Sequence, residues 1–287
     1  MLQIIIIIIG ILICFFLLVM CIDCNRFIVV SYEIESKKIS REYSFALLSD
    51  LHNKSFGKQN DKLLKAIDGL SPDAVITAGD MITAQSGEKY KTAEALMVNL
   101  ARKYPIYYGI GNHEHHLATS PDKFGNINIY EKYMDALREA GIEPLINESI
   151  RLPSSNINVC GLQLDRRYFA KFRNKEMPEN YLNDLMGRAD MDSFQILIAH
   201  NPDYFADYAK WGADLVLSGH VHGGLMKLPV LGGVISPKLT LFPHYDGGRF
   251  EYNDCVMILS RGLGTHTLPI RIFNPGELVF VRLKPKI

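Results

Sequence analysis

The feature that most constrains this fold is a short apolar run, followed by residues of metal-binding types, that recurs five times along the chain. Amphipathic segments with helical spacing alternate with most of these runs. Such an alternation of buried strands and helices is typical of an α/β domain built on largely parallel sheets. The apolar runs are residues 43–49, 74–78, 106–110, 195–199 and 213–217, and the helical segments are residues 59–70, 88–104, 128–140, 178–187 and 203–211.

Polar residues follow each of the five apolar runs. In α/β sheets, ligands bind beyond the carboxyl ends of the strands, because the loops converge there. A single histidine at a strand end more often has a structural role, but five such endings in order favour a common site. We expect the following side chains to meet there: Asp50, His52, Asp80, Asn112, His113, His200, His220 and His222.

Seven of these residues are candidate metal ligands, and their types indicate the class of metal. Imidazole and carboxylate suit divalent Mn, Fe and Zn, and the absence of a thiolate argues against a structural zinc site. Seven ligands suffice for two ions if a carboxylate bridges them, and Asp80 is the best bridge. Glycines beside His220 and His222 allow the backbone to turn between two ions. The candidate ligands are Asp50, His52, Asp80, Asn112, His200, His220 and His222.

The order and spacing of these residues resemble those of the calcineurin-like metallophosphoesterases. The resemblance implies an α/β four-layer sandwich, in which two mixed β-sheets are flanked by α-helices. It implies one metal on Asp50, His52, Asp80 and His222, and a second on Asp80, Asn112, His200 and His220. Glu114 stands where the family often has Asp, a change that bears on the orientation of His113. The matching motifs are Asp50-x-His52, Gly79-Asp80, Gly111-Asn112-His113-Glu114, His200 and Gly219-His220-x-His222.

The resemblance implies hydrolysis of a phosphodiester, a phosphomonoester or a pyrophosphate. A hydroxide that bridges two metals is expected to attack phosphorus in line with the leaving oxygen. His113 is not needed as a ligand, so it is the candidate catalytic residue that protonates this oxygen. One alternative is a catalytically silent metal-binding scaffold of the same fold. A two-zinc hydrolase that cuts amides is a weaker alternative, because the chain lacks a His-x-His-x-Asp run.

Further motifs are similar to those of the membrane-anchored bacterial phosphoesterases of the YkuE and YaeI type. A relative of that group acts on a diacylated sugar nucleotide. The resemblance therefore makes a phosphate-containing small molecule or lipid the expected partner, and lipid-linked pyrophosphates are candidate substrates. These motifs are Asp50-Leu51-His52-Asn53, His200-Asn201-Pro202, Gly219-His220-Val221-His222-Gly223-Gly224, Ser260-Arg261-Gly262-Leu263-Gly264 and Pro269-Ile270-Arg271.

The N-terminal segment predicts one transmembrane helix. Residues 4–22 carry no charge, and about 19 residues suffice to cross a hydrocarbon core of ~30 Å. The alternative is a cleaved signal peptide, which the length of the apolar run and the large residues at 19–21 disfavour. We therefore expect a single-pass anchor in the cell membrane, with the side of the catalytic domain left open. The predicted organisation is an anchor at 1–24, a stalk and first strand at 25–42, and a metallophosphoesterase domain at 43–287.

The charge balance bears on the partners. The chain has 31 basic and 31 acidic residues, so no nucleic-acid-binding face is expected. Local cations must then hold an anionic substrate, and Arg166 and Arg167 are weak candidates, with a solvated loop as the alternative. Asn53 is a third weak candidate, for contact with phosphate or orientation of His52, and a role in the turn is the alternative. The five cysteines form no framework of disulfides or metal ligands.

Overall fold

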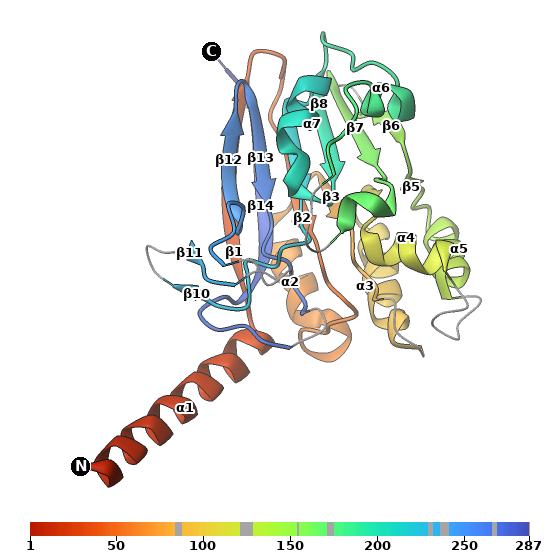
Figure 1. The fold of residues 1–287 in the computed structure, drawn as a ribbon. Coiled ribbons are helices and arrows are strands. Elements are labelled where there is room, and N and C mark those ends of the chain that lie inside the picture. The colour runs from red at the N-terminus through yellow and green to blue at the C-terminus, as the bar shows by residue number, and fades with distance from the viewer. Residues whose placement is uncertain are drawn as a thin grey trace.

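The structure is a computed structural model, in which two mixed β-sheets pack face to face with helices on both outer sides (Figure 1). It describes residues 1–83, 88–120, 129–153, 155–170, 175–228, 232–235, 241–265 and 269–286.

The first sheet has its C-terminal strand in the interior. β14 (Gly276–Pro285) lies between β1 (Phe27–Ser36) and β2 (Tyr43–Leu48). It runs parallel to β1 and antiparallel to β2, and the remaining neighbours are parallel. Because β2 and β3 are buried on both faces, they are apolar along almost their whole length. The order of strands is β1, β14, β2, β3 (Ala74–Ala78), β4 (Ile106–Gly109) and β5 (Pro144–Leu145).

The second sheet has a parallel centre and an antiparallel strand at each edge. Its three central strand pairs are parallel, and β12 and β6 run against their neighbours. A separate two-stranded sheet is formed by β10 (Lys227–Leu228) and β11 (Gly232–Gly233). The order in the large sheet is β12 (Gly248–Tyr252), β13 (Cys255–Leu259), β9 (Leu215–Ser218), β8 (Phe194–Ala199), β7 (Ile157–Leu162) and β6 (Glu148–Arg151).

Three apolar clusters join the layers. One lies between the two sheets and includes Phe45, Ile196 and Leu217. The second lies between the first sheet and α2 to α5, and the third lies between the second sheet and α6 and α7. The arrangement is thus helices, sheet, sheet, helices, and the predicted four-layer α/β sandwich is confirmed. The helices are α2 (Asp61–Leu70), α3 (Lys91–Ala101), α4 (Asn112–Thr119), α5 (Ile129–Glu139), α6 (Tyr181–Met186) and α7 (Phe205–Trp211).

Helix boundaries differ from the sequence prediction in several places, and α6 and α7 begin at Tyr181 and Phe205 rather than at residues 178 and 203. The helix predicted over residues 88–104 is a 3₁₀ turn, η2 (Glu88–Tyr90), followed by α3, which ends at Ala101. The short helix α4 was not expected at all. It begins at Asn112, within the motif after β4, and three histidines among its eight residues obscure its apolar face. Residue 128, the expected first residue of the next helix, lies outside the described residues.

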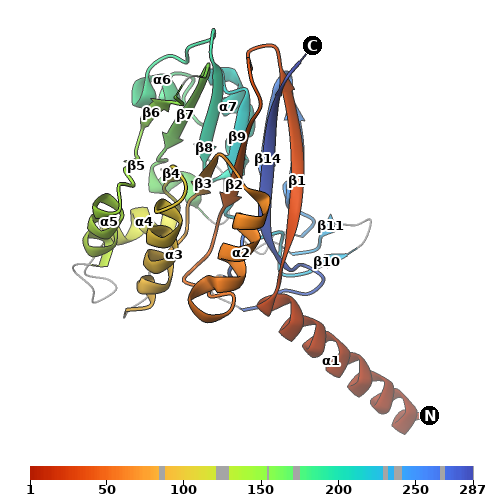
Figure 2. The same ribbon diagram turned by 180° about the vertical axis from the view of Figure 1, so that it is seen from behind.

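α1 (Leu2–Asn25) projects from the domain, as Figures 1 and 2 show. It is 24 residues long, and within the described chain it is the helix that is long and apolar enough to cross a membrane. A signal sequence would meet the same criterion. β1 follows α1 directly and pairs with β14 from Phe27 to Ser36. The base of α1 is therefore attached to the first sheet.

Candidate metal centre

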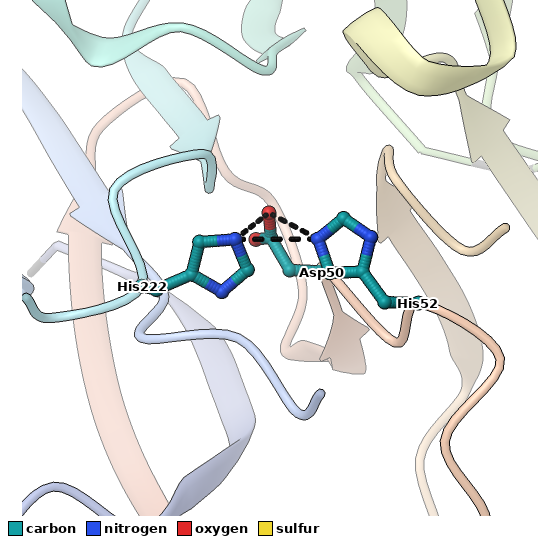
Figure 3. Close-up of side chains that lie close together, drawn as sticks. All are labelled: Asp50, His52 and His222. Atoms are coloured by element: carbon teal, nitrogen blue, oxygen red, sulfur yellow. Dashed lines mark hydrogen bonds and ion pairs between the residues drawn. The ribbon is translucent and has the colours of Figure 1, made fainter. Parts of the chain in front are cut away.

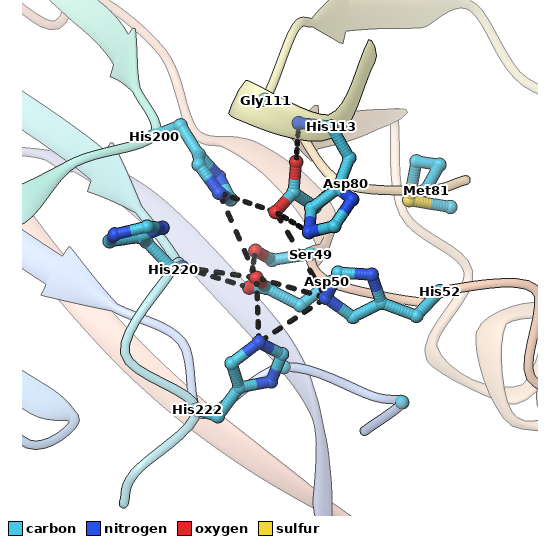
Figure 4. A network of polar contacts seen from close by, with 12 residues as sticks. Ser49, Asp50, His52, Asp80, Met81, Gly111, His113, His200, His220 and His222 are labelled. Carbon is cyan, nitrogen blue, oxygen red and sulfur yellow. Dashed lines mark hydrogen bonds and ion pairs between the residues drawn. The ribbon is translucent and has the colours of Figure 1, made fainter. Parts of the chain in front are cut away.

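The candidate ligands converge where the two sheets meet. Asp50 and His52 follow β2, Asp80 follows β3, and α4, which begins at Asn112, follows β4. The second sheet supplies the remaining residues, since His200 follows β8 and the loop with His220 and His222 follows β9. Figure 4 shows that the side chains of five histidines gather around Asp50 and Asp80, and these histidines are His52, His113, His200, His220 and His222. The predicted convergence of the five loops is thus observed.

The ligand atoms form three overlapping groups. Within each group, all candidate atoms lie within 4.8 Å of one another. The rings of His220 and His222 belong to different groups. The groups are Asp50, His52 and His222; His52, Asp80 and His113; and Asp80, His200 and His220.

His52 and His222 bring two ring nitrogens close together (Figure 3). Their Nε2 atoms are 3.2 Å apart, and His222 Nε2 is 3.5 Å from Asp50 Oδ1. Two nitrogens that each lie ~2.1 Å from one ion are separated by about 3.0–3.4 Å at ligand angles of 90–110°. The spacing of these rings therefore fits two ligands of one divalent cation.

His200 is held in a tautomer suited to metal binding. Its Nδ1 lies 2.6 Å from the main-chain oxygen of Ala78, which can only accept a hydrogen bond, so Nδ1 carries the proton. The other ring nitrogen, Nε2, faces the site, 3.0 Å from Asp80 Oδ2. A hydrogen bond from the distal nitrogen to a carbonyl is the usual support of a ligating histidine.

The start of α4 brings an amide and an imidazole to the site. Asn112 Oδ1 is buried and has no hydrogen-bond partner among the residues that the structure describes. A buried amide oxygen without a partner is costly, and a hard cation satisfies it. The main-chain N–H of His113 donates to Asp80 Oδ1 at 2.8 Å, and its Nε2 is 4.0 Å from Asp80 Oδ2. The side chain of His113 is 14% exposed, so it borders the opening of the site.

The loops carry the ligands on left-handed backbone. Values of φ above zero are uncommon for residues other than glycine, and they cluster where a function requires them. The sequence alone did not reveal this feature. The φ angles are 50° at Asp50, 48° at His52, 54° at Asp80, 74° at His220 and 54° at His222.

Two glycines allow other loops to approach Asp50. A Cβ atom at Gly219 would collide with the Asp50 carboxylate, and one at Gly262 would lie 2.6 Å from Asp50 Cβ. The main-chain N–H of His220 consequently reaches Asp50 and donates to both of its carboxylate oxygens at 3.1 Å. The hydroxyl of Ser49 also donates to Asp50. These contacts hold the carboxylate before any ion binds.

Glu114 supports the loop of Asp80. Its buried carboxylate accepts hydrogen bonds from the main-chain N–H groups of Asp80 at 3.0 Å, Met81 at 2.7 Å and Ile82 at 3.2 Å. Gly111 N and the Tyr108 hydroxyl also donate to it. Burial, followed by the nearby Asp80 charge, raises the pKa of Glu114 to about 7. The Glu in place of Asp thus fixes the Asp80 loop against α4, a role that sequence reasoning missed.

Charges in the site are strongly interdependent. Burial raises the pKa of the Asp50 carboxyl to about 6, and the attraction of His200 opposes that shift. Burial also disfavours the charged form of Asp80, but the imidazoles of His200 and His113 outweigh it and hold the pKa of that carboxyl well below its usual range. Burial lowers the pKa of His200, but Asp80, Asp50 and the Ala78 carbonyl together outweigh burial and raise this pKa to about 10. A ligating imidazole must be neutral, so a cation and this proton compete for His200.

The three weak substrate candidates lie around the site, not within the ligand groups. Asn53 has φ 60° and donates to the Thr83 hydroxyl at 3.0 Å, which fits its role in the turn. Arg166 contacts Ser120 Oγ at 2.8 Å and His116 Nε2 at 3.0 Å. Arg167 lies over the rings of Tyr168 and Tyr181.

An aromatic residue near the arginines was missed by the sequence reasoning. Phe169 ends η4 (Arg166–Phe169), and its ring centroid lies 5.3 Å from that of His220 and 6.3 Å from that of His200. The pattern of metal-binding residue types in the sequence could not indicate Phe169, because its side chain is apolar.

A second buried polar cluster lies behind Asp50. We call it the arginine cluster, and it consists of Arg261, Arg271 and Glu277. Arg261 pairs with Glu277, while the fully buried Arg271 donates to main-chain oxygens of the loop that packs against Asp50. Burial lowers the pKa of Arg271 to about 10, so it is charged near neutral pH. The acceptors of Arg271 are the carbonyls of Arg261, Gly262, Gly264, Asn274 and Pro275.

Comparison with known proteins places this fold and site in a family. The family model described as calcineurin-like phosphoesterase matches residues 43–224, which is more than half of the chain. The chain therefore belongs to the calcineurin-like phosphoesterase family, and the family predicted from the ligand spacing is confirmed.

Curated relatives agree with this assignment. An uncharacterized metallophosphoesterase of Helicobacter pylori is 28% identical over 87% of this chain, which spans only 62% of that relative's length. The uncharacterized metallophosphoesterase YkuE of Bacillus subtilis is 26% identical over 84% of this chain and 79% of its own. UDP-2,3-diacylglucosamine pyrophosphatase LpxG of Chlamydia muridarum is 27% identical over 77% of each chain. The predicted likeness to YkuE is thus confirmed.

Proposed function

We propose that this chain hydrolyses phosphoesters with two divalent cations held between its two sheets. The observation that carries the proposal is the position of the Asp80 carboxylate. It lies 3.0 Å from His200 Nε2 of the second sheet and 4.0 Å from His52 Nε2 of the first. One carboxylate thus faces two groups of ligand atoms, as a bridge between paired ions requires.

The proposed ligands fall into two sets that share Asp80. Mn, Fe and Zn suit such oxygen and nitrogen donors. When bound, the ions supply Lewis-acid activation of water and neutralise charge on the phosphoryl group. The first set is Asp50, His52, Asp80 and His222, and the second is Asp80, Asn112, His200 and His220.

His113 is the proposed catalytic acid. Its main-chain N–H is fixed by Asp80, and its partly exposed ring borders the proposed ions without being needed as a ligand. From there the imidazolium donates a proton to the leaving oxygen. General acid catalysis of this kind contributes about 10²- to 10⁴-fold to a rate.

The proposed substrate is a phosphodiester, a phosphomonoester or a pyrophosphate. LpxG is named for hydrolysis of a pyrophosphate in a diacylated sugar nucleotide, which supports a lipid-linked substrate for this chain as well. α1 is proposed to anchor the chain in the membrane, where such a substrate resides. Arg166 is the better placed of the two arginines to bind phosphate, because it contacts α4, the helix that carries His113.

The test uses the full-length chain in detergent micelles, loaded with Mn²⁺. Bis-p-nitrophenyl phosphate reports diesterase activity, p-nitrophenyl phosphate reports monoesterase activity, and metal content is measured in parallel. We expect His113→Gln to depress turnover about 10²- to 10⁴-fold at unchanged metal content. His244→Gln, outside the ligand groups, is the matched control. Equal losses of metal and turnover in the His113 variant would make His113 a ligand or a structural residue.

The alternative function is a metal-binding scaffold without catalysis. Two bound equivalents of metal with no hydrolysis of diesters, monoesters or UDP-linked pyrophosphates would support it, whichever of Mn²⁺, Fe²⁺ or Zn²⁺ is bound. The ligand set supports the enzyme, since six of the seven proposed ligands belong to groups of close ligand atoms and the seventh, Asn112, has a buried amide oxygen without a partner among the described residues.

A further inference from the structure

The loop of residues 269–274 joins α1 to the candidate metal centre. We call it the anchor loop. On the side of α1, the main-chain N–H of Asn274 donates to Asp23 Oδ2 at 3.1 Å, and Cys24 Sγ lies 3.3 Å from the Pro269 oxygen. Asp23 is also paired with Arg26 at 2.8 Å and is only 1% exposed. A carboxylate at the end of an apolar helix is thus fully engaged by the domain.

One face of α1 lies against the anchor loop. Val19 and Met20 are half-buried and Asp23 is buried, whereas most of the remaining helix is exposed. Residues three, four and seven positions apart lie on the same side of a helix, so Phe16 continues this face toward the N-terminus. The anchor loop therefore extends along α1 past the last helical turn, toward the N-terminus of the helix.

Phe273 reaches the apolar part of α1. Its ring centroid lies 6.3 Å from those of both Phe15 and Phe16, and its side chain remains 40% exposed. Phe16 precedes Ile22, the last residue of the apolar run, by six residues, or about 9 Å along the helix axis. If α1 spans a bilayer with its apolar run in the hydrocarbon, Phe273 lies at the depth of the acyl chains.

The same loop holds the metal-ligand loop. The side-chain amide of Asn274 donates to the main-chain oxygens of His222 at 2.7 Å and Gly224 at 2.8 Å. The loop continues into a parallel bridge between Ile272 and Met226. Phe273 is therefore connected to the loop of His222 through its neighbour Asn274, whose side-chain amide makes both hydrogen bonds.

We propose that Phe273 and the exposed apolar face of α1 form one lipid-contacting surface, which seats the metal centre at a fixed height on the bilayer. The occupant is the acyl-chain region of a phospholipid bilayer, because Phe273 continues the apolar surface of a helix with no charge between residues 4 and 22. The inference rests on the proposed membrane anchoring, but not on the proposed hydrolysis. A substrate with a phosphate at the membrane surface then meets the site without leaving the bilayer.

The test places single tryptophans in the full-length chain reconstituted into phosphatidylcholine vesicles. The native Trp211 is replaced by Phe, and Phe273→Trp, Phe15→Trp or Ile150→Trp is added. Phosphatidylcholine brominated on its acyl chains quenches tryptophan only on contact. Ile150 is an exposed apolar residue on β6, an edge strand of the second sheet, and serves as the matched control. Circular dichroism confirms that each variant is folded.

We expect the tryptophan fluorescence of F273W to be blue-shifted and quenched nearly as much as that of F15W, and far more than that of I150W. If F15W is quenched but F273W behaves like I150W, the surface is covered by protein or water, and the inference is wrong while the anchor stands. If F15W itself is not quenched, the anchor and the inference both fail. Hydrolysis is measured separately, so the loss of either proposal is distinguishable from the loss of the other.

Discussion

The metal centre and the arginine cluster are neighbouring buried polar regions. They differ in how their charged groups are paired. In the arginine cluster, one guanidinium donates to five main-chain carbonyls, and Arg261 pairs with Glu277. In the metal centre, two carboxylates and several imidazoles crowd together, and Asn112 Oδ1 has no hydrogen-bond partner among the described residues. Most buried polar groups of the first region are paired within the chain, although Glu277 Oε1 has no hydrogen-bond partner among the described residues, whereas the second region is suited to completion by cations.

This difference separates residues that mainly stabilise the fold from residues that mainly bind the proposed ions. Removing a group from the arginine cluster leaves acceptors buried and unmatched, which destabilises the fold. Removing a carboxylate from the metal centre takes away a proposed ligand, so its distinguishing consequence is the loss of ion binding. Mutations in the two regions should therefore differ in their effect on ion binding, although both clusters contact the Asp50 loop.

The largest effect is expected from Asp80→Asn, which removes the proposed bridge. We expect turnover to fall about 10³-fold or more, because paired-metal chemistry depends on the shared carboxylate. The metal-free variant should be less stable than the metal-free wild type at neutral pH, because the imidazoles of His200 and His113 stabilise the ionised form of Asp80 in the folded state and hold its pKa well below the usual range. Activity, metal content and thermal unfolding are measured together. Asp68→Asn, a surface carboxylate, is the control, and unchanged turnover and metal content in D80N would contradict the proposed bridging role of Asp80.

Arg271→Met should destabilise the fold by about 3–5 kcal/mol, as expected when one side of a buried charged network is removed. The methionine keeps the apolar stem but removes a donor from five carbonyls, of which, within the described chain, only that of Gly262 also accepts from a main-chain N–H, that of Glu277. Chemical unfolding in detergent measures the change. Arg249→Met, which loses only an exposed pair with Glu251, should cost about 0–1 kcal/mol. Equal effects of the two variants would remove the contrast between the regions.

Removal of the metal tests the difference between the metal centre and the arginine cluster without a mutation. Chelation should lower the unfolding free energy of the wild-type chain by about 2.7–4.1 kcal/mol for each ion removed, if each site was loaded at 100 to 1,000 times its dissociation constant. Thermal unfolding with and without chelator gives the shift. Arg271→Met should show the same shift from a lower starting point, whereas Asp80→Asn should show a much smaller one. A chelator shift of the wild-type size in D80N would show that Asp80 does not hold the ions.

The smallest of these effects is expected from Glu114→Gln, which keeps the shape of the side chain. The amide offers one acceptor oxygen to the main-chain N–H groups of Asp80, Met81 and Ile82, where the carboxylate offers two. Loss of such support lowers metal affinity by about 10- to 100-fold. Calorimetric titration of metal measures this change. Glu139→Gln, at the exposed end of α5, is expected to leave the affinity unchanged, and an unchanged affinity in E114Q would make Glu114 purely structural.

The sequence predicted the sheets and the ligand loops well for a physical reason. A strand buried on both faces must be apolar throughout, so runs such as Ala74–Ala78 are recognisable, and the polar residue after each run is conspicuous. The same local signals did not reveal α4, where His113, His115 and His116 interrupt the apolar periodicity. They gave no warning of left-handed backbone at Asp50 or Asp80, because tertiary contacts impose it.

Longer-range features were also beyond the sequence patterns. Glu114 was recognised as a departure from the family pattern, but its partners in the Asp80 loop lie more than 30 residues away. Every residue has a main-chain carbonyl, so the sequence does not indicate which carbonyls surround Arg271. The contact between Phe273 and α1 joins segments about 260 residues apart, a pairing that no local periodicity encodes.

The position of β14 also sets an order of events during biosynthesis. β14 separates β1 from β2, so these two early strands cannot take their places until residues 276–285 have left the ribosome. An N-terminal anchor would meet the membrane long before that moment. The first sheet, and with it the Asp50 loop, would then close only after synthesis of β14, and a chain cut before residue 276 would leave both β1 and β2 with an open edge.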